Sequence, residues 1–345
     1  MFSKQKEVFH MASIRDVAKL AGVSITTVSR IINNDQNFFI TKETKDKVYQ
    51  AIKELNYKIP DSYKVNKSKK SNIGCIQRLT VEGTKDNFFS TITSGITEHL
   101  SKFGKNLQFS LTQFDLESDD FENMFQTYPL GMIIMGDISE SAYNFLKANV
   151  KYIIGVETTY DDIDNIRYNR YYAGLEAVNH LIDCGHKKIA YIGSNINSDD
   201  LTNIGRYEAY LRVLQKNNLE INPDWIINCN WHRETCFNET IKLLQSENRP
   251  TAIFVASDHM AIASMAAIHS LGLSIPEDIS VIAISDIVES AYLTPPLTTV
   301  SIPQKEMGKI ATEILLQRIN GDTTITKQVF VPCKLIVRNS VKKIN

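Results

Sequence analysis

Apolar residues near the start of the chain recur with the period of an α-helix. The spacing i, i+3, i+4, i+7 is met by Ile14, Val17, Ala18 and Ala21. Ser13 and Asp16 form a pair like a capping box at the start of this helix. Gly22 permits a sharp turn, and Ser24 is placed to cap a second helix. The pattern therefore predicts two short helices joined by a tight turn.

The second helix separates apolar from polar residues, and a third helix follows. The second helix is expected to bury Val28, Ile31 and Ile32, and the third, starting at Thr41, to bury Val48, Ala51, Ile52 and Leu55. The outer face of the second helix carries hydrogen-bonding groups, namely Thr26, Ser29, Arg30 and Asn33. Arginine suits the acceptors of guanine, and asparagine suits adenine or a phosphate. The pattern favours an all-α helix-turn-helix headpiece; the alternative is a helical hairpin with a solvated polar face.

From residue 72 onward, short apolar runs alternate with helical patterns. These runs are Ile73–Ile76, Gly131–Met135, Tyr152–Val156, Lys188–Ile192, Ala252–Val255 and Ile279–Ile284. Continuous apolar runs are typical of parallel strands that are buried on both faces. About 270 residues exceed the size at which one core keeps growing. The sequence therefore predicts an α/β body of two doubly wound lobes that enclose a cleft.

Charge is divided unevenly between the two parts. Residues 1–71 carry 14 Lys and Arg against 7 Asp and Glu, a net charge of +7. The rest carries 24 against 32, a net charge of −8. A polyanion such as DNA is attracted only to the first part.

The headpiece resembles that of the LacI/GalR family of bacterial repressors. The matching residues are Asp16–Ala18, Ala21–Ser24, Thr27–Arg30, Thr44, Val48 and Leu55–Tyr57. The resemblance implies a DNA-binding headpiece over 11–57, in which Ile25, Thr26 and Arg30 face base edges. It also implies that Ser24, Thr27, Ser29 and Asn33 contact phosphates. Ile25 departs from the polar or aromatic residues often found there, so we expect a different operator preference.

The segment 58–71 contains five lysines and one proline and is expected to be a linker. In the family this segment forms a hinge helix that inserts an apolar side chain, usually leucine, into the minor groove. No leucine is present here, which leaves Tyr63 or Val65 as the candidate wedge. The alternative is a flexible basic tether. Residues 1–10 are expected to be a disordered tail, with Met1 and Met11 both open as translation starts.

The body carries further matches to the same family. They are Asn87–Phe89 with Ile92, Gly95, Ile96 and Gly104, then Leu181–Gly193, Phe254–Asp258, Gly272–Ser280 and Pro295–Val300. They imply a body over 72–340 that is like a periplasmic binding protein. Its first lobe is expected over 72–164 and 298–327, and its second over 165–297 and 328–340. The chain would cross between the lobes near residues 164, 297 and 328.

Side chains after predicted strands are the candidates for contact with an effector. Sugar hydroxyls suit Arg and Asp, and the apolar faces of a sugar suit aromatic rings. The candidates are Phe88, Phe89, Arg206, Trp231, Asp258 and Asp286. The resemblance adds Ser257 and Ser285, at positions where the family often has Asn and Asp. Core or capping roles remain open alternatives for Trp231, Asp258 and Phe89.

Residues 254–280 and 329–338 look most like the ebg-type repressors of β-galactosidase genes. This resemblance implies galactose or a β-galactoside as effector. Two headpieces side by side are needed to read a pseudo-palindromic operator, so we expect a homodimer that binds double-stranded operator DNA. A sugar-binding or sugar-modifying protein without operator specificity is the alternative.

Several patterns narrow the function further. Five scattered cysteines suit a reducing cytoplasm and offer no zinc site. A DNA-binding protein of the cytoplasm is expected to be associated with the nucleoid. No apolar run reaches the length of a membrane span. No Walker loop, Gly-x-Gly-x-x-Gly turn or nucleophile elbow is present, so neither an enzyme nor a cofactor is expected.

Overall fold

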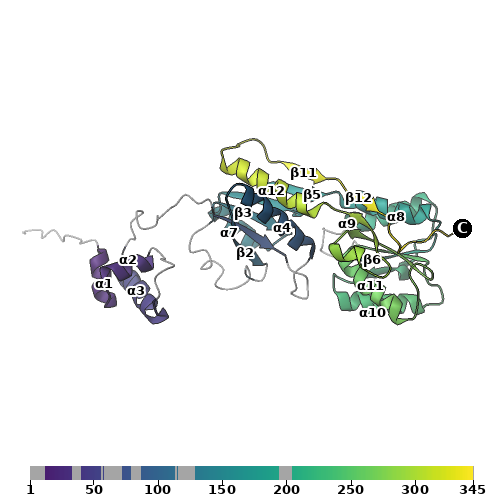
Figure 1. Cartoon of the computed structure of the whole chain (residues 1–345), viewed down its shortest axis with the longest axis horizontal. Helices are drawn as coiled ribbons and strands as arrows, with labels where there is room; N and C mark the ends of the chain where they lie inside the picture. Colours follow the sequence, from purple (N-terminus) through teal and green to yellow (C-terminus); the bar gives the residue numbers. More distant parts are fainter. Residues whose placement is uncertain are drawn as a thin grey trace, which may run out of the picture. The chain divides into compact units, whose positions relative to one another are not determined.

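The computed structural model describes residues 12–32, 40–55, 57, 72–78, 87–112, 115, 129–193 and 204–344. The chain divides into two compact units at residues 70 and 71, which we call the headpiece and the body. The two units are described separately below (Figure 1).

The headpiece consists of three short helices around one small core. They are α1 (Ile14–Ala21), α2 (Ile25–Ile32) and α3 (Lys42–Glu54). Each expected apolar stripe is turned toward this core, which includes Val17, Val28 and Val48 as its most buried members. Gly22 takes the left-handed conformation, with φ 66°, and ends α1. The pattern of apolar residues therefore predicted these three helices correctly.

The first lobe of the body contains a six-stranded parallel sheet. Its order is β2 (Leu107–Thr112), β1 (Ile73–Gln77), β3 (Gly131–Met135), β4 (Tyr152–Val156), β5 (Asp164–Tyr168) and β11 (Gln328–Val331). One face packs against α4 (Asn87–Lys102) and α12 (Gln304–Ile319), and the other packs against α7 (Glu140–Asn149). Neighbouring side chains of β3 show this. Ile133 belongs to the apolar cluster on the side of α4 and α12, and Ile134 belongs to the cluster on the side of α7.

The second lobe contains the other six-stranded sheet. Its order is β7 (Ile226–Asn228), β6 (Ile189–Gly193), β8 (Ala252–Val255), β9 (Ser280–Ser285), β10 (Thr298–Ser301) and β12 (Lys334–Ile336), of which only β12 is antiparallel. The helices of this lobe are α8 (Arg170–Asp183), α9 (Ile204–Lys216), α10 (Arg233–Gln245) and α11 (Asp258–Ser270), with short 3₁₀ turns η1 (Pro223–Trp225) and η2 (Val288–Ala291). Figure 1 shows the helices of each lobe lying against its own sheet.

All six strands expected from apolar runs are present, within one or two residues at each end. The lobe boundaries differ from the expected ones. Pairing of β5 and β11 extends the first lobe to residues 168 and 331, and β10 belongs to the second lobe. The three crossings therefore lie near residues 169, 302 and 332, a few residues after the expected 164, 297 and 328. The expected boundaries came from the family resemblance and fell at the starts of β5, β10 and β11, which no long apolar run marks.

The two long helices of the first lobe approach each other closely. A Cβ added at Gly308 of α12 would overlap the carbonyl oxygen of Ile92, and one added at Gly95 of α4 would overlap that of Lys305. Both glycines therefore allow close backbone contact between α4 and α12.

One core cluster contains residues from both lobes, among them Ile133 and Ile282.

Candidate functional site

The exposed face of α2 carries most of the side chains expected to contact DNA. Thr26 and Arg30 are exposed, Ser29 is half-buried, and the side chain of Ile25 is 44% exposed. An exposed isoleucine at the first turn of a small helix offers apolar contact to a partner surface. The described part of this face therefore has the polar and apolar groups that reading of base edges requires.

Ser24 and Thr27 also have a local structural task. The Ser24 hydroxyl accepts a hydrogen bond of 3.0 Å from the backbone N–H of Thr27, which caps α2 as expected. The two hydroxyl groups lie 2.8 Å apart. At α1, the Asp16 carboxylate accepts hydrogen bonds from the backbone N–H and the hydroxyl of Ser13. Asn33, Tyr63 and Val65 lie outside the described residues, as do residues 1–10 and 58–71.

The second candidate region lies where the carboxyl ends of strands from both lobes meet. Backbone conformations are unusual here. Of the six described non-glycine residues with positive φ, five follow or end a strand: Glu157, Asn230, Trp231, Ser285 and Asp286. Such conformations cost free energy and concentrate at functional sites. The carboxyl ends of strands are also where α/β proteins hold ligands.

Arg206 lies at the centre of this region. Its guanidinium carbon is 5.6 Å from the centre of the Tyr168 ring and 5.7 Å from that of Trp231, so that two rings flank it. Its side chain also donates a hydrogen bond to the Tyr168 hydroxyl. Only 8% of Arg206 is exposed. The guanidinium is therefore nearly enclosed, with two aromatic rings beside it and one N–H group donating to Tyr168.

The aromatic residues expected near Arg206 are connected to it through Tyr168. The rings of Phe88 and Tyr168 are 6.4 Å apart, and Phe88 meets Phe89 edge to face at 5.3 Å. The structure thus brings Phe88, Phe89, Arg206 and Trp231 into one chain of contacts. We call this group of residues, which lies where the two lobes meet, the inter-lobe cleft. Tyr168 was not predicted from the sequence, because it ends a strand that lacks an apolar run.

Glu157 and Arg170 also belong to this region and were not predicted. Glu157 follows β4, is 4% exposed, and forms an ion pair with Arg170 at the start of α8. Burial raises the pKa of the Glu157 carboxyl, while Arg170 and the backbone N–H of Tyr168 oppose that shift. No sequence motif distinguishes this glutamate from surface carboxylates.

Asp258 occupies a closed position within the second lobe. It is fully buried, and its carboxylate accepts hydrogen bonds from the Ser290 hydroxyl at 2.5 Å, the Thr299 hydroxyl at 2.6 Å and the Ile287 N–H at 3.1 Å. Burial raises its pKa to about 6. The structure therefore gives Asp258 an anchoring role, holding the segment after β9, in place of the expected contact with an effector. Ser257, not Asp258, caps α11, accepting from the Met260 N–H.

The remaining two candidates lie at the end of β9. The Ser285 carbonyl oxygen accepts a hydrogen bond of 2.7 Å from the Gln304 amide, which lies in the first lobe. Asp286 forms an ion pair of 2.7 Å with Arg338. Both residues lie at the end of β9, near the inter-lobe cleft. The two contacts join parts of the body to each other. The expected contact of both residues with an effector stays a prediction.

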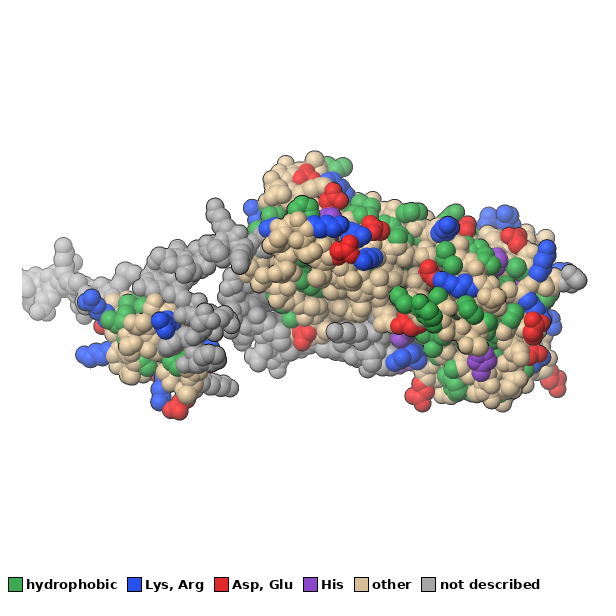
Figure 2. Space-filling model, viewed as in Figure 1, with side chains coloured by type: hydrophobic (Ala, Val, Ile, Leu, Met, Phe, Trp, Pro, Cys, Tyr) green, Lys and Arg blue, Asp and Glu red, His purple; other side chains and the backbone are tan. Residues whose placement is uncertain are grey.

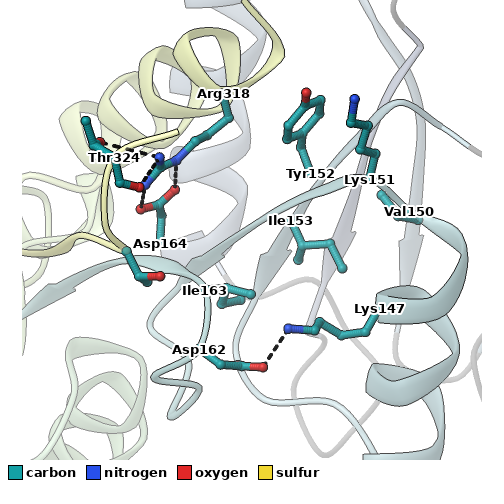
Figure 3. A pocket seen from close by; sticks show the side chains of 11 residues that line it. Lys147, Val150, Lys151, Tyr152, Ile153, Asp162, Ile163, Asp164, Arg318 and Thr324 are labelled. Carbon is teal, nitrogen blue, oxygen red and sulfur yellow. Dashed lines mark hydrogen bonds and ion pairs between the residues drawn. The ribbon is translucent and has the colours of Figure 1, made fainter. Parts of the chain in front are cut away.

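A separate pocket of about 240 Å³ opens at the amino ends of β4 and β5 (Figure 3). Four of its five charged side chains form ion pairs: Lys147 contacts Asp162 at 2.6 Å, and Arg318 contacts Asp164 at 2.7 Å. It lies at the opposite edge of the sheet from the inter-lobe cleft. Because these charges are paired with each other, we do not assign the effector to this pocket.

Within the described ranges, no group of acidic, histidine or cysteine side chains is arranged to hold a metal ion. None of the helices in that part of the chain has the length and apolar character needed to span a membrane.

Comparison with known protein families gives two matches. Residues 13–60 match the family described as "Bacterial regulatory proteins, lacI family". Residues 178–341 match the "Periplasmic binding protein-like domain". The first covers the helices of the headpiece, and the second covers most of the second lobe together with α12 and the last strands.

Curated relatives align with almost the whole chain. A transcriptional repressor named PurR from Haemophilus influenzae (strain PittEE) is 34% identical over 97% of this chain and 100% of its own length. The PurR of Vibrio vulnificus (strain CMCP6) is also 34% identical over 97% of the chain. These relatives are repressors rather than enzymes.

Solved structures share the fold. A lac repressor dimer bound to operator superposes with a TM-score of 0.66 at 24% identity, covering 96% of this chain and 100% of the other. A complex of the regulator CelR with cellobiose gives a TM-score of 0.68 at 22% identity, covering 95% and 99%. These comparisons confirm the expected helix-turn-helix headpiece and the two-lobed body like a periplasmic binding protein.

Proposed function

Because this chain belongs to the lacI family of bacterial transcriptional regulators, we propose that a small carbohydrate bound in its inter-lobe cleft controls its binding to operator DNA. The chain itself is a DNA-binding transcriptional repressor of that family. The observation that carries the effector proposal is Arg206, whose guanidinium edge is the polar donor among the aromatic side chains Phe88, Tyr168 and Trp231.

In the DNA-binding part of the proposal, α2 enters the major groove. Arg30, Thr26 and Ile25 contact base edges there, because they are the exposed side chains of this helix. The Ser24, Thr27 and Ser29 hydroxyls and Asn33 contact phosphates, and Tyr63 is the candidate wedge in the minor groove. Figure 2 shows Lys and Arg side chains projecting from the described surface of the headpiece, as attraction to phosphates requires.

In the effector part, aromatic rings contact the apolar faces of a sugar and Arg206 donates to its hydroxyl groups. The CelR–cellobiose structure and a ribose-bound regulator from Enterococcus faecium favour a sugar. The resemblance of residues 254–280 and 329–338 to ebg-type repressors favours galactose or a β-galactoside. The PurR relatives favour a purine as the second candidate, and flanking aromatic rings suit such a planar ligand equally.

We also propose that the protein acts as a homodimer in the cytoplasm. Two headpieces side by side are needed to read a pseudo-palindromic operator. Val288 in η2 is 71% exposed and Tyr292, which follows it, is 81% exposed. Aromatic side chains are enriched at protein interfaces, so these two neighbouring exposed residues are our candidates for the dimer contact.

The test of the effector is thermal unfolding of the full chain against galactose, methyl β-D-galactopyranoside, ribose, cellobiose, hypoxanthine and guanine. A ligand at 100 times its Kd stabilises the folded state by about 2.7 kcal/mol. We expect a β-galactoside to raise the melting temperature and to weaken binding to the operator. A shift with the two purines alone would replace the sugar by a purine, and a shift with none of the six compounds would reject both candidates.

A further inference from the structure

Two polar contacts join the lobes beside the first crossing of the chain. Arg206 on α9 donates to the Tyr168 hydroxyl at the end of β5, and Arg170 at the start of α8 pairs with Glu157 after β4. Both donors belong to the second lobe and both acceptors to the first. The crossing itself lies at residue 169, between Tyr168 and Arg170.

The two contacts share a support within the first lobe. Besides its pair with Arg170, the Glu157 carboxylate accepts a hydrogen bond of 2.8 Å from the backbone N–H of Tyr168. Tyr168 is 2% exposed and Glu157 is 4% exposed. A buried polar group that loses its hydrogen-bond partner costs free energy. Because Glu157 is bonded both to Arg170 and to the backbone of Tyr168, loss of the Tyr168–Arg206 contact should also disturb the Glu157–Arg170 contact.

We propose that Glu157 and Tyr168 are positioning residues for effector recognition. Together with Arg170 and Arg206 they form what we call the polar clamp, which fixes the guanidinium edge of Arg206 relative to both lobes. The inference rests on the proposed function in one respect, namely that the effector binds at Arg206. The placement of Arg206 by the polar clamp is independent of which ligand is bound.

The polar clamp gives a ligand a direct route to the orientation of the lobes. Arg206 stands on the second lobe but is hydrogen-bonded to the first through Tyr168. A ligand that takes hydrogen bonds from Arg206 therefore changes the strength of a contact between the lobes. Because a ligand shifts a conformational equilibrium only by its differential interaction with the two states, such a shared side chain is a suitable point of coupling.

The experiment uses the fluorescence of Trp231 in the full chain without ligand. The second tryptophan, Trp225, is 2% exposed, so acrylamide quenching reports mainly on the half-buried Trp231. Tyr168→Phe keeps the ring that faces Arg206 and removes only the hydroxyl. Because loss of a charge-assisted hydrogen bond lets Arg206 leave the Trp231 ring, we expect the quenching constant to rise about two-fold or more. Glu157→Gln should act in the same direction.

Tyr210→Phe is the matched control, because its buried hydroxyl donates to the Ile189 carbonyl inside the second lobe, away from the crossing. It should quench like the parent protein. If Tyr168→Phe and Glu157→Gln both quench like the parent, or if all three variants quench equally more, the polar clamp is rejected.

A second measurement separates this inference from the proposed function. With methyl β-D-galactopyranoside as the probe, Tyr168→Phe should weaken binding about five-fold or more, while Tyr210→Phe should bind like the parent. If the parent protein binds none of the six compounds, the proposed function fails, and the quenching data still decide the polar clamp. If the parent binds the probe and Tyr168→Phe binds it equally well, the positioning role is overturned.

Discussion

The Thr299 hydroxyl donates a hydrogen bond of 2.6 Å to the Asp258 carboxylate, although both side chains are completely buried. Asp258 thereby joins the start of α11 to β10, and through Ser290 it also holds η2. This buried carboxylate leads to a prediction about stability and pH.

Burial raises the folded-state pKa of Asp258 to about 6, from 3.8. Because the folded state binds this proton more tightly than the unfolded state, protonated Asp258 adds to the free energy of unfolding at pH 4. This contribution is lost as the pH rises through 6. The free energy of unfolding should fall by up to about 3 kcal/mol over this window. Asp258→Asn should remove this part of the fall, as measured by denaturant unfolding at pH 4, 5, 6 and 7. Asp224→Asn, which removes an exposed carboxylate from the same lobe, should keep it; an Asp258→Asn protein with the parent's pH dependence would contradict the prediction.

Arg30→Ala should weaken binding to the operator by about 1 to 3 kcal/mol, because a guanidinium that reads guanine contributes to discrimination between sequences. Fluorescence anisotropy against a selected operator and a scrambled duplex measures both affinities. Lys53→Ala is the control, since Lys53 is exposed on α3 and lies outside α2. It should leave the ratio of the two affinities unchanged. Equal operator binding by Arg30→Ala and the parent would remove Arg30 from the reading role.

Arg206→Ala should keep operator binding but lose the response to the effector. The expected loss of ligand affinity is ten-fold or more, because hydrogen bonds to a charged group contribute about 1.5 to 3 kcal/mol. Melting temperatures with and without ligand measure it. Arg212→Ala, on the exposed side of the same helix, is the matched control. Release of Arg206→Ala from the operator at the parent's ligand concentration would count against the cleft.

Tyr292→Ser should weaken the proposed dimer about ten-fold or more, since truncation of an aromatic side chain at an interface commonly costs over 1 kcal/mol. Sedimentation velocity over a range of concentrations measures this. Tyr171→Ser, on the exposed part of α8, serves as a control for loss of a surface tyrosine. A Tyr292→Ser protein that dimerises like the parent places the interface elsewhere.

Gly308→Ala should lower the free energy of unfolding by about 1 to 3 kcal/mol, because a methyl group there meets the Ile92 carbonyl oxygen. Urea unfolding measures the change. Ser94→Ala, exposed on α4, should stay within about 0.5 kcal/mol of the parent. An unchanged stability of Gly308→Ala would mean that the two helices separate without cost.

Sequence patterns located the parts of this chain whose side chains are uniformly apolar or periodically apolar. For this reason the predictions of α1 and α2 agree closely with the structure. So do those of the six buried strands β1, β3, β4, β6, β8 and β9. β5 was not predicted because it mixes the polar residues Asp164, Asn165 and Arg167 with apolar ones, and its polar side chains find partners only in the folded lobe. The same reason hid Tyr168, and with it the lobe boundary.

The candidate site was predicted only in part. Arg206 and Trp231 were candidates because each was expected after a strand, and their mutual contact is a product of folding. Glu157 was missed because its burial and its pair with Arg170 depend on residues brought together from two lobes. Asp258 was given the wrong environment, since spacing along the chain does not tell a cleft-facing carboxylate from one enclosed by Ser290 and Thr299.

The strand order has a consequence for how the chain is made. Each sheet of the body receives its last strand from the final part of the sequence, β11 in one lobe and β12 in the other. Neither sheet has all of its strands until β11 and β12 have been translated, so we expect the two lobes to complete their folding together. A headpiece with its own small core has no such delay, and nascent chains should acquire it first.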